Sequence, residues 1–370
     1  MDLSQEEKQG DAQPEVKGSK RIGIIGYGHL GQFLRIELSK SPSKFTIKKI
    51  WNRTEEEKEN VLPLTELNES SLADIDLVIE VAHPDVIHEF GKMILGKADL
   101  FIGSPTALAT QTTLDGLQER LIENKHRSVF VPSGALWGAN DIQRMANLGI
   151  LKGLTITMLK HPSSLKVADS LKMLCQRAIK SNMPVVLYDG PVRLLCPLAP
   201  NNVNTMAAAA IAAHTLGFEN TRAKLIADPA LLNWHIIEYE LEGENGFRTT
   251  VRRENPAQAG AVTGDTTYFS FLSSVREALY KPLDSTFADG FYVQEFNSLA
   301  SAKPDRLNFD KEEINGSIFE LVQQNLASFI SQYTVNDQTA FMMSVGDSAM
   351  TSHFSQAVEY TMVLKVWIIA

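Results

Sequence analysis

The chain has 370 residues, a length typical of two or three domains. Hydrophobic residues make up 44% and charged residues 21% of the chain, which excludes a fibrous or largely disordered protein. The net charge of −9, without any basic cluster, argues against nucleic-acid binding and favours a protein that acts on small molecules.

Neither the cysteines nor the ends of the chain indicate a secreted or membrane protein. Cys175 and Cys196 have no CxxC spacing for zinc and are too few for a disulfide framework, which favours a reducing compartment. Residues 1–19 are polar and predict a flexible leader without a signal peptide. The closing apolar run contains Lys365 and is shorter than the roughly 20 residues that span a bilayer. We therefore expect a cytoplasmic protein without a membrane partner.

The first third of the chain alternates short apolar runs with helical patterns. After the apolar run 21–25, leucine and phenylalanine recur at helical spacing through Leu38, and a second helix is expected at 111–124. Strands that alternate with helices pair in parallel, so we predict an α/β fold with a doubly wound Rossmann sheet. The strands expected in this sheet are 21–25, 45–52, 76–82, 99–105 and 128–134.

A second sheet, mixed or antiparallel, is expected after residue 150. Asn245-Gly246 separates two of its strands and predicts a hairpin turn. An alanine-rich helix is expected at about 202–216, and a helix at 267–279 that returns to the first domain. The strands expected in the second sheet are 154–159, 184–190, 231–241 and 247–253.

These patterns predict a discontinuous domain organisation. We expect a dinucleotide-binding domain at 20–132 plus about 255–279, and a catalytic and dimerisation domain at 133–254. Residues 280–370 form an extension of unknown role. There, Ser317 and Glu320 have the spacing of a capping box and predict one amphipathic helix.

The sequence GYGHLG follows the first predicted strand and opens the first helix. In a strand-helix-strand unit this is the pattern of a dinucleotide fingerprint. Gly26 would make the tight turn, Gly28 would let a pyrophosphate approach the backbone, and Gly31 would let the helix pack on the strand. The cofactor-binding residues expected around this sheet are Gly26, Gly28, His29, Leu30, Gly31, Asn52, Arg53, Ala82, His83 and Ser104.

The end of the second strand bears on the choice between NAD and NADP. A carboxylate there would bind the ribose hydroxyls of NAD and repel a 2′-phosphate, but this sequence has Asn52 and Arg53. We therefore expect NADP to be accepted, with preference over NAD left open; the alternative interpretation is that Arg53 is a solvated surface residue. His83, at the end of another strand, is open to two interpretations: a residue lining the nicotinamide pocket, or a cap of the following turn.

Two polar clusters in the second domain are candidates for the chemistry. Asn233 and His235 lie two apart in a predicted strand and would share one face. Spacing alone leaves open whether His235 transfers protons or is satisfied by hydrogen bonds in the core. Asn202 and Asn204 lie at the predicted start of the alanine-rich helix and would either cap it or bind a substrate carboxylate. Arg253, beside Arg252, is an alternative carboxylate clamp.

Seven stretches of the chain form a pattern when taken together: GYGHLG, VIEVAHP, IGSPTALA, VPSGALWGA, GPVRLLCPLAPNNVNTMAAAA, ADPALLNWHIIEYELEG and ENPAQAGAVTG. Together they resemble the L-aspartate dehydrogenase family, in particular its animal branch. The resemblance covers about residues 20–279 and implies NAD(P)-dependent oxidation of L-aspartate to oxaloacetate and ammonia, in a homodimer. By position it implies that His235 is the active-site histidine and that Asn233 and Ala135 contact the cofactor.

The resulting hypothesis places His235 as the general base that activates water to attack an imine. Substrate contacts are expected from Ser133, Asn202, Asn204 and Arg253, and no metal is expected because the sequence has no HExxH or Cys/His cluster. Two alternatives stay open. One is an imine or 2-oxo acid reductase with a different substrate, and the other is an NADP(H)-binding regulator without turnover.

Overall fold

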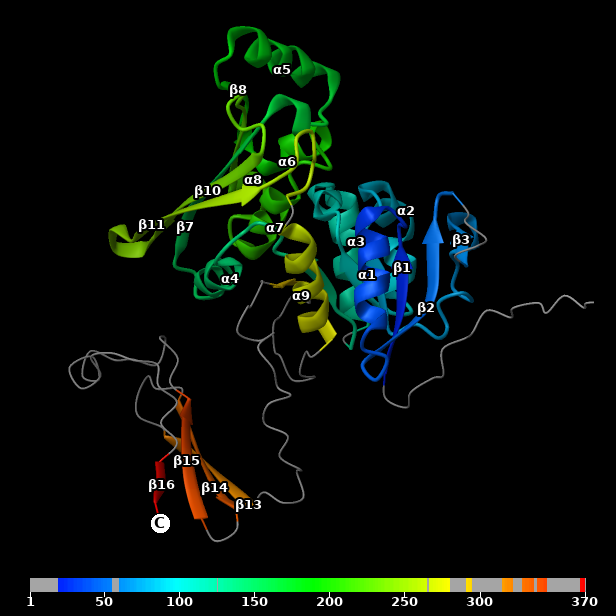
Figure 1. The fold of residues 1–370 in the computed structure, drawn as a ribbon, viewed down its shortest axis with the longest axis vertical. Coiled ribbons are helices and arrows are strands. Elements are labelled where there is room, and N and C mark those ends of the chain that lie inside the picture. Colours follow the sequence, from blue (N-terminus) through cyan, green and yellow to red (C-terminus); the bar gives the residue numbers. More distant parts are fainter. Residues whose placement is uncertain are drawn as a thin grey trace, which may run out of the picture. The chain divides into compact units, whose positions relative to one another are not determined.

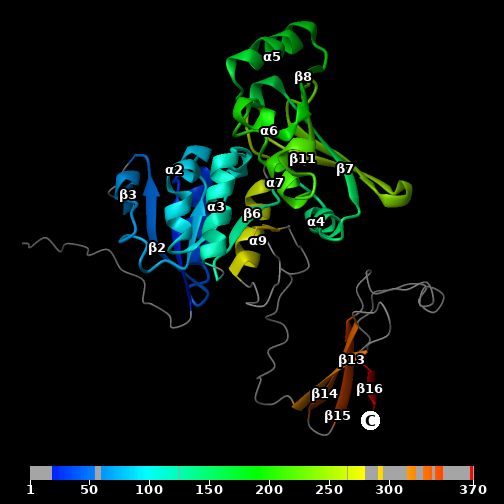
Figure 2. The ribbon, with the colours of Figure 1, turned by 180° about the vertical axis from the view of Figure 1, so that it is seen from behind.

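The computed structural model describes residues 19–54, 60–124, 126–264, 266–279, 291–294, 315–321, 328–335, 338–344 and 367–369. The protein divides into a large unit, Met1–Asn297, and a small unit, Ser298–Ala370. Residues 1–18 of the predicted leader lie outside the described part. Both sheets predicted from the sequence belong to the large unit, which Figures 1 and 2 show from opposite sides.

The first sheet is parallel and has the order β12-β6-β5-β4-β1-β2-β3. Apart from β12, which the sequence did not predict, this is the strand order of a Rossmann sheet. The fold-class prediction is therefore confirmed. The strands are β1 (Lys20–Ile25), β2 (Phe45–Asn52), β3 (Val61–Pro63), β4 (Leu77–Glu80), β5 (Asp99–Ile102), β6 (Val129–Pro132) and β12 (Phe291–Gln294).

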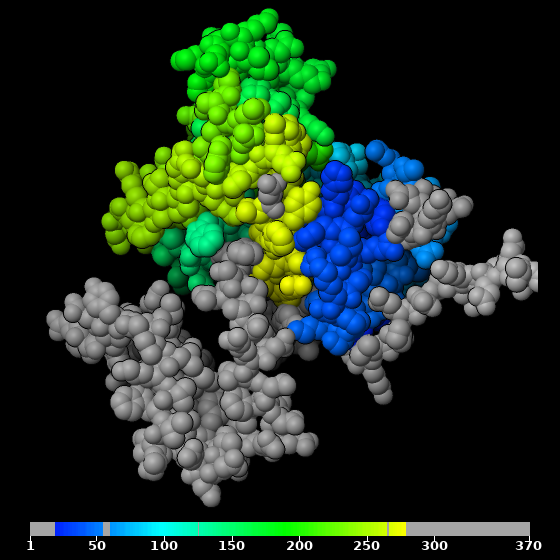
Figure 3. Space-filling view, viewed as in Figure 1, coloured from blue at the N-terminus to red at the C-terminus, as the bar shows by residue number. Residues whose placement is uncertain are grey.

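Helices cover both faces of the first sheet, because alternate strand residues are apolar on both sides. Ile79 packs in a cluster with residues of α1 and α9, whereas its neighbour Val78 packs with residues of α2 and α3. In Figure 3 the yellow α9 lies against the blue α1. Packing of α9 on this sheet agrees with a returning helix, while the domain boundaries stay a prediction. The helices are α1 (His29–Ser39), α2 (Pro84–Leu95), α3 (Gln111–Glu123) and α9 (Thr267–Leu279).

The second sheet is mixed and has the order β11-β10-β7-β9-β8. Its strands are β7 (Leu151–Lys160), β8 (Val185–Pro191), β9 (Arg222–Ala227), β10 (Trp234–Gly243) and β11 (Arg248–Pro256). The accompanying helices are α4 (Ala139–Asn147), α5 (Asp169–Ser181), α6 (Val192–Leu195), α7 (Asn204–Ala212) and α8 (Gly217–Asn220). The buried α7 is the predicted alanine-rich helix, and its core cluster continues into the α2 and α3 side of the first sheet.

The hairpin between β10 and β11 forms as its sequence predicts. Asn245 has φ +56° and Gly246 has φ +79°, a conformation that asparagine and glycine adopt at low cost. The turn fixes the register, in which His235 of β10 lies directly opposite Asn255 of β11. The hairpin thereby positions two polar side chains of the site described below.

The small unit contains an antiparallel sheet in the order β13-β14-β15-β16. The predicted amphipathic helix beginning near Ser317 is wrong, because β13 and β14 are strands and residues 322–327 lie outside the described part. Aromatic and β-branched residues are frequent in β14, and the pairing of β13 with β14 outweighs the local capping-box pattern. The strands are β13 (Asn315–Leu321), β14 (Ser328–Val335), β15 (Gln338–Ser344) and β16 (Trp367–Ile369).

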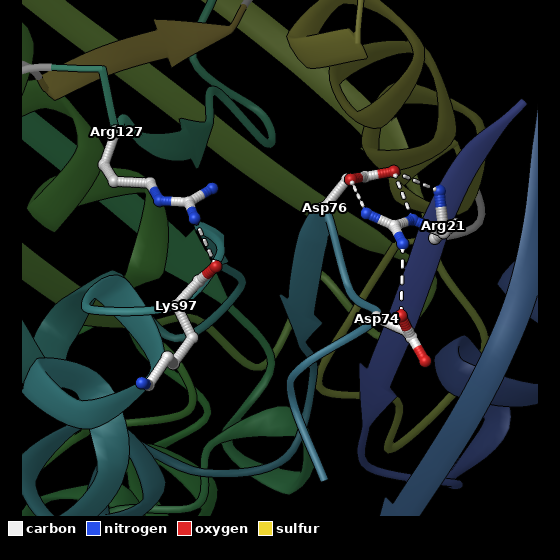
Figure 4. A network of polar contacts seen from close by, with 5 residues as sticks. All are labelled: Arg21, Asp74, Asp76, Lys97 and Arg127. Carbon is white, nitrogen blue, oxygen red and sulfur yellow. Dashed lines mark hydrogen bonds and ion pairs between the residues drawn. The ribbon is translucent and has the colours of Figure 1, made fainter. Parts of the chain in front are cut away.

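Charged groups close the amino-terminal end of the first sheet. Arg21 at the start of β1 donates to Asp76, just before β4, with Nη2 to Oδ1 at 2.8 Å, and to Asp74 at 3.3 Å. Nearby, Arg127 donates to the Lys97 carbonyl (Figure 4). These contacts lie at the end of the sheet opposite the glycine turn, which follows the carboxyl end of β1. Among the described helices, none is long and apolar enough to cross a bilayer.

Candidate active site

The turn between β1 and α1 leaves no room for side chains at two of its glycines. Gly26 has φ +106°, and a Cβ there would lie 2.8 Å from the carbonyl carbon and oxygen of Val81. A Cβ on Gly31 would lie 2.1 Å from the carbonyl oxygen of Gly26. The close passage of α1 over the end of β1 therefore requires both glycines.

Gly28 differs from these two because nothing lies within 4 Å of the position of an added Cβ. It is the N-cap residue of α1, and this helix end is not capped by any side chain. The amide groups of the first turn therefore point into open space at the positive end of the helix dipole. A dinucleotide pyrophosphate fits this arrangement of free amides beside an exposed glycine.

The end of β2 carries an amide and a guanidinium. The Asn52 side-chain oxygen accepts a hydrogen bond from the Tyr27 amide at 3.3 Å, which ties β2 to the glycine turn. Arg53 follows and is exposed, as is His29 on the first turn of α1. Neither Asn52 nor Arg53 is acidic, whereas NAD-specific sites have an aspartate or glutamate at this end of the strand.

Glu80 connects the carboxyl ends of β4 and β5. It is fully buried, and its carboxylate accepts from the Ala82 amide at 2.7 Å and from the Ser104 hydroxyl at 2.6 Å. Burial raises the pKa of Glu80 to about 7, although these donors favour its charged form. One carboxylate therefore fixes Ala82 and Ser104, two of the expected cofactor contacts.

His83 caps the following helix. Its Nδ1 accepts from the Asp85 amide at 3.3 Å at the N-cap position of α2. Of the two interpretations that the sequence left open, the structure shows the turn cap, and His83 is not among the residues that line the cavity described next.

A cavity of about 130 Å³ lies between the two sheets of the large unit. Leu30, two residues after Gly28, lines it from the glycine turn, and Pro132 lines it from the end of β6. Met158, Lys160 and His235 line it from the second sheet. The end of the first sheet that carries the glycine turn and the polar face of the second sheet therefore both contribute to one cavity.

Three polar side chains cross the second sheet in a row at this cavity. His235 of β10 is opposite Lys160 of β7 on one side and opposite Asn255 of β11 on the other, in antiparallel register. Residues directly opposite in antiparallel strands point to the same face. All three line the cavity, and each is only 4% exposed.

His235 is buried with one ring nitrogen free. Among the described residues its Nε2 has no hydrogen-bond partner, while the backbone of Ala261 hydrogen-bonds the ring. Burial and then the charge of Lys160 lower the pKa of His235 to about 4, against the smaller opposing effect of Ala261. The imidazole is therefore neutral at physiological pH and able to accept a proton.

Lys160 is the residue that the sequence analysis missed. Its Nζ donates to the Val262 carbonyl at 3.0 Å and to the Asn202 carbonyl at 3.4 Å, and burial lowers its pKa to about 8. A signal was present in the sequence, because Met158 and Lys160 share the inward face of β7 and a charged residue there is unusual. That Lys160 lies beside His235 depends on the register between β7 and β10, which the local sequence does not specify.

The predicted pairing of Asn233 with His235 is wrong. Strand β10 begins at Trp234, so Asn233 lies in the preceding turn, where it is exposed and does not line the cavity. The turn closes with the Trp234 amide donating to the Leu231 carbonyl. The Asn233 carbonyl still accepts from the Ala257 amide at 2.9 Å across the hairpin, but its side chain lies outside the cavity lining, and its contact with a cofactor stays a prediction.

Asn202 and Asn204 both line the cavity, but neither caps α7, whose N-cap residue is Val203. The Asn202 side chain donates to the Ser164 carbonyl at 2.9 Å and accepts from the Lys166 amide at 2.8 Å, so it holds this loop. The Asn204 side-chain oxygen accepts from the Thr106 hydroxyl at 3.4 Å. Of the two, Asn204 is the more available to a ligand.

The other expected contacts are divided between the cavity wall and the layer behind it. Ala135 lines the cavity, whereas Ser133 is fully buried and does not. Arg253 donates to the Gly134 carbonyl at 3.5 Å and thus supports the wall from behind. Arg252 is exposed and pairs with Glu238 and Glu254, so the two arginines do not act as one clamp.

Comparisons with known proteins agree with this two-part arrangement. A family described as "Homoserine dehydrogenase, NAD binding domain" matches residues 23–132, and one described as "Aspartate dehydrogenase, C-terminal" matches residues 141–277. An "Aspartate dehydrogenase domain-containing protein" of Xenopus tropicalis is 43% identical over 267 residues, covering 69% of this chain and 93% of the relative.

More distant relatives are named as enzymes. An "L-aspartate dehydrogenase" of Methanocella arvoryzae is 27% identical over 269 residues, covering 70% of this chain and 96% of the relative. The crystal structure of an aspartate dehydrogenase from Thermotoga maritima has a TM-score of 0.53 at 22% identity, covering 72% of this chain and 98% of that chain, and supports the fold. The chain therefore belongs to the aspartate dehydrogenase family and carries the NAD(P)-binding domain of a dehydrogenase.

Proposed function

We propose that this protein is an NAD(P)-dependent L-aspartate dehydrogenase that interconverts L-aspartate with oxaloacetate and ammonia. The observation that carries the proposal is the free Nε2 of His235 at a cavity that Leu30 connects to the glycine turn. Gly28 and the first turn of α1 would hold the pyrophosphate of a dinucleotide, and Leu30 of that turn lines the same cavity as His235. The family's enzyme members support the choice of substrate.

The reaction needs an oxidant, water and one proton-transfer group. L-Aspartate loses a hydride from C2 and a proton from nitrogen to give iminosuccinate, and water then replaces the imine nitrogen to give oxaloacetate and ammonia. The nicotinamide ring, when bound, accepts the hydride. The residues of the protein position the substrate and move protons, because orientation of the reacting groups lowers the barrier once the cofactor and water supply the reagents.

His235 is the proposed general base for the addition of water. Its neutral Nε2 accepts a proton as the water oxygen attacks the imine carbon, and returns that proton to the departing nitrogen. The backbone hydrogen bond at Ala261 fixes the ring orientation. Asn255, which donates to the His235 carbonyl at 3.2 Å, holds the neighbouring strand in register.

We further propose that NADP is accepted and is preferred to NAD. Arg53 is exposed directly after Asn52 and can pair with a 2′-phosphate. Neither of these two residues is acidic, so neither repels the phosphate. Replacing Arg53 by alanine should weaken NADPH binding by about tenfold and leave NADH binding within about twofold, since only NADPH carries the phosphate. Titration of each cofactor by fluorescence measures the ratio. Equal losses for both cofactors would count against a role of Arg53 in selection.

Turnover assays separate this proposal from its alternatives. Purified protein is mixed with NADPH, ammonia and oxaloacetate, and loss of the reduced cofactor is followed by absorbance, with NADH and with pyruvate or 2-oxoglutarate in parallel. Oxidation that depends on oxaloacetate supports the dehydrogenase, whereas oxidation with another 2-oxo acid supports a related reductase. Tight NADPH binding without turnover of any of these acids supports a regulator.

The proposed assembly is a homodimer, as the family resemblance implies. Light scattering on the purified full-length protein measures its mass directly. A monomer that turns over oxaloacetate would remove the dimer from the proposal and leave the chemistry standing.

A further inference from the structure

A buried ammonium group in the cavity has no counter-charge in the described part of the protein. Lys160 is 4% exposed, its Nζ donates to two carbonyl oxygens, and no described carboxylate pairs with it. A buried charge that lacks an opposite charge is costly, unless a ligand supplies one when it binds. A lysine ammonium has three donor hydrogens, and the carbonyls of Val262 and Asn202 account for two.

Lys160 lies beside His235, the proposed proton-transfer residue, so its third donor hydrogen is available to a ligand there. It lies directly opposite His235 in the β7 and β10 pair, on the same face of the sheet. On its other side the register partner is Ala227 of β9, which has no polar group to offer. Lys160 and His235 are the only titratable side chains among the described residues that line the cavity.

We propose that Lys160 binds a carboxylate of the substrate, an inference that rests on the proposed function of the same cavity. The site therefore selects carboxylic acid anions, and the bound anion completes a network that already contains the Val262 and Asn202 carbonyls. Those two carbonyls hold the ammonium at the cavity wall before substrate arrives, so binding requires little rearrangement. Lys160 is thus a substrate-binding residue, distinct from the proton-transfer role of His235.

The test replaces Lys160 by methionine, which keeps an unbranched stem and removes the charge. The matched control is Lys152→Met, which removes a lysine from the exposed start of the same strand, where it pairs with Glu244. The probe is L-malate, which carries both carboxylates of aspartate with a hydroxyl in place of the amine. Calorimetry in the presence of saturating NADPH measures its affinity without any turnover.

Lys160→Met should lose L-malate affinity by about tenfold or more, because a charge-assisted hydrogen bond is lost, while Lys152→Met stays within about twofold of the unmodified protein. NADPH affinity should be unchanged in both, which shows that the variants are folded. In turnover, KM for oxaloacetate should rise by about the same factor as the malate dissociation constant. L-Lactate, which lacks the distal carboxylate, identifies which carboxylate Lys160 binds: loss for both acids assigns the C1 carboxylate, and loss for malate alone assigns the distal one.

A pH titration of the unmodified protein provides a test that needs no variant. Malate affinity should fall above about pH 8 as the Lys160 ammonium loses its proton. His235 is the titratable group that faces Lys160 from β10, and it stays neutral throughout this range.

The outcomes separate this inference from the proposed function. If the malate affinity of Lys160→Met is within about twofold of that of the unmodified protein, and the variant binds NADPH normally, this result overturns the inference even if aspartate is turned over. So does malate affinity that is flat from about pH 7 to 10. Conversely, malate binding that depends on Lys160, in a protein that turns over no amino acid, supports the anion site and rejects the dehydrogenase.

Discussion

His235 combines burial with an unused nitrogen, and this combination separates a reactive histidine from a structural one. A histidine satisfied by the core would have both ring nitrogens paired, whereas Nε2 here lacks a partner among the described residues and the ring lines the cavity. Burial, and then the charge of Lys160 beside it, lower the pKa of His235 and keep the imidazole uncharged. A neutral imidazole and an ammonium group therefore lie side by side on one sheet.

Replacing His235 by glutamine should lower kcat for oxaloacetate amination by about 100- to 10,000-fold, the usual contribution of a positioned acid-base group. Glutamine keeps polar atoms in a similar volume, so NADPH affinity should be unchanged. The control is His88→Gln, which alters an exposed histidine on α2. A His235→Gln variant with at least half of the original kcat would contradict the assignment.

The expected pH profile of kcat/KM follows from the two titratable groups that line the cavity. His235 must be neutral to act as a base and loses its proton above about pH 4, while Lys160 must be protonated to hold an anion and loses its proton above about pH 8. We expect kcat/KM to be level between about pH 5 and 7 and to decline above about 8. A decline near pH 6.5 on the acid side, typical of an unperturbed histidine, would show that His235 is more exposed to water or to negative charge than we describe.

Among the elements, short apolar runs and alternation predicted nine of the twelve strands in the two large sheets and missed β3, β9 and β12. The bounds of β2 and α9 match the sequence patterns, and the β10–β11 hairpin follows from the local demands of Asn245-Gly246. Non-local features were not predictable in this way. The row formed by Lys160, His235 and Asn255 depends on which strands pair and in which register. Strand β12 depends on its partner strand β6, which is far away in the sequence.

The glycine turn offers a test in which folding and binding separate. Gly31→Ala should destabilise the protein by about 1–3 kcal/mol, because its Cβ would collide with the Gly26 carbonyl. Gly28→Ala should leave the melting temperature nearly unchanged, since its Cβ meets open space, yet weaken NADPH binding by about tenfold or more where the phosphates approach. Thermal unfolding and cofactor titration of both variants check this. Unimpaired NADPH binding by Gly28→Ala would place the pyrophosphate elsewhere.

At the scale of the whole molecule, the proposed chemistry belongs to the large unit. The aspartate dehydrogenase family match ends at residue 277, and the Xenopus relative aligns over 69% of this chain. The family match therefore does not include the sheet of the small unit, β13 to β16. No chemical motif is recognisable in the sequence of residues 280–370, and their role stays open to experiment.

Ending the protein after Asn297, which keeps β12 paired with β6, should preserve kcat and NADPH affinity within about threefold, because the cavity and the glycine turn both lie before residue 280. Steady-state kinetics of the shortened and full-length proteins provide the comparison. Loss of turnover in a shortened protein that still binds NADPH would show that the small unit contributes to the active site.

The proposed function requires that this protein removes a hydride from C2 of L-aspartate. Full-length protein is incubated with NADP⁺ and L-aspartate deuterated at C2, and the cofactor and the organic acid are then analysed by mass spectrometry. We predict that each reduced cofactor carries one deuterium and that oxaloacetate and ammonia form in equal amounts. Reduced cofactor without deuterium, or no reduction at all while NADP⁺ binds, would contradict the claim.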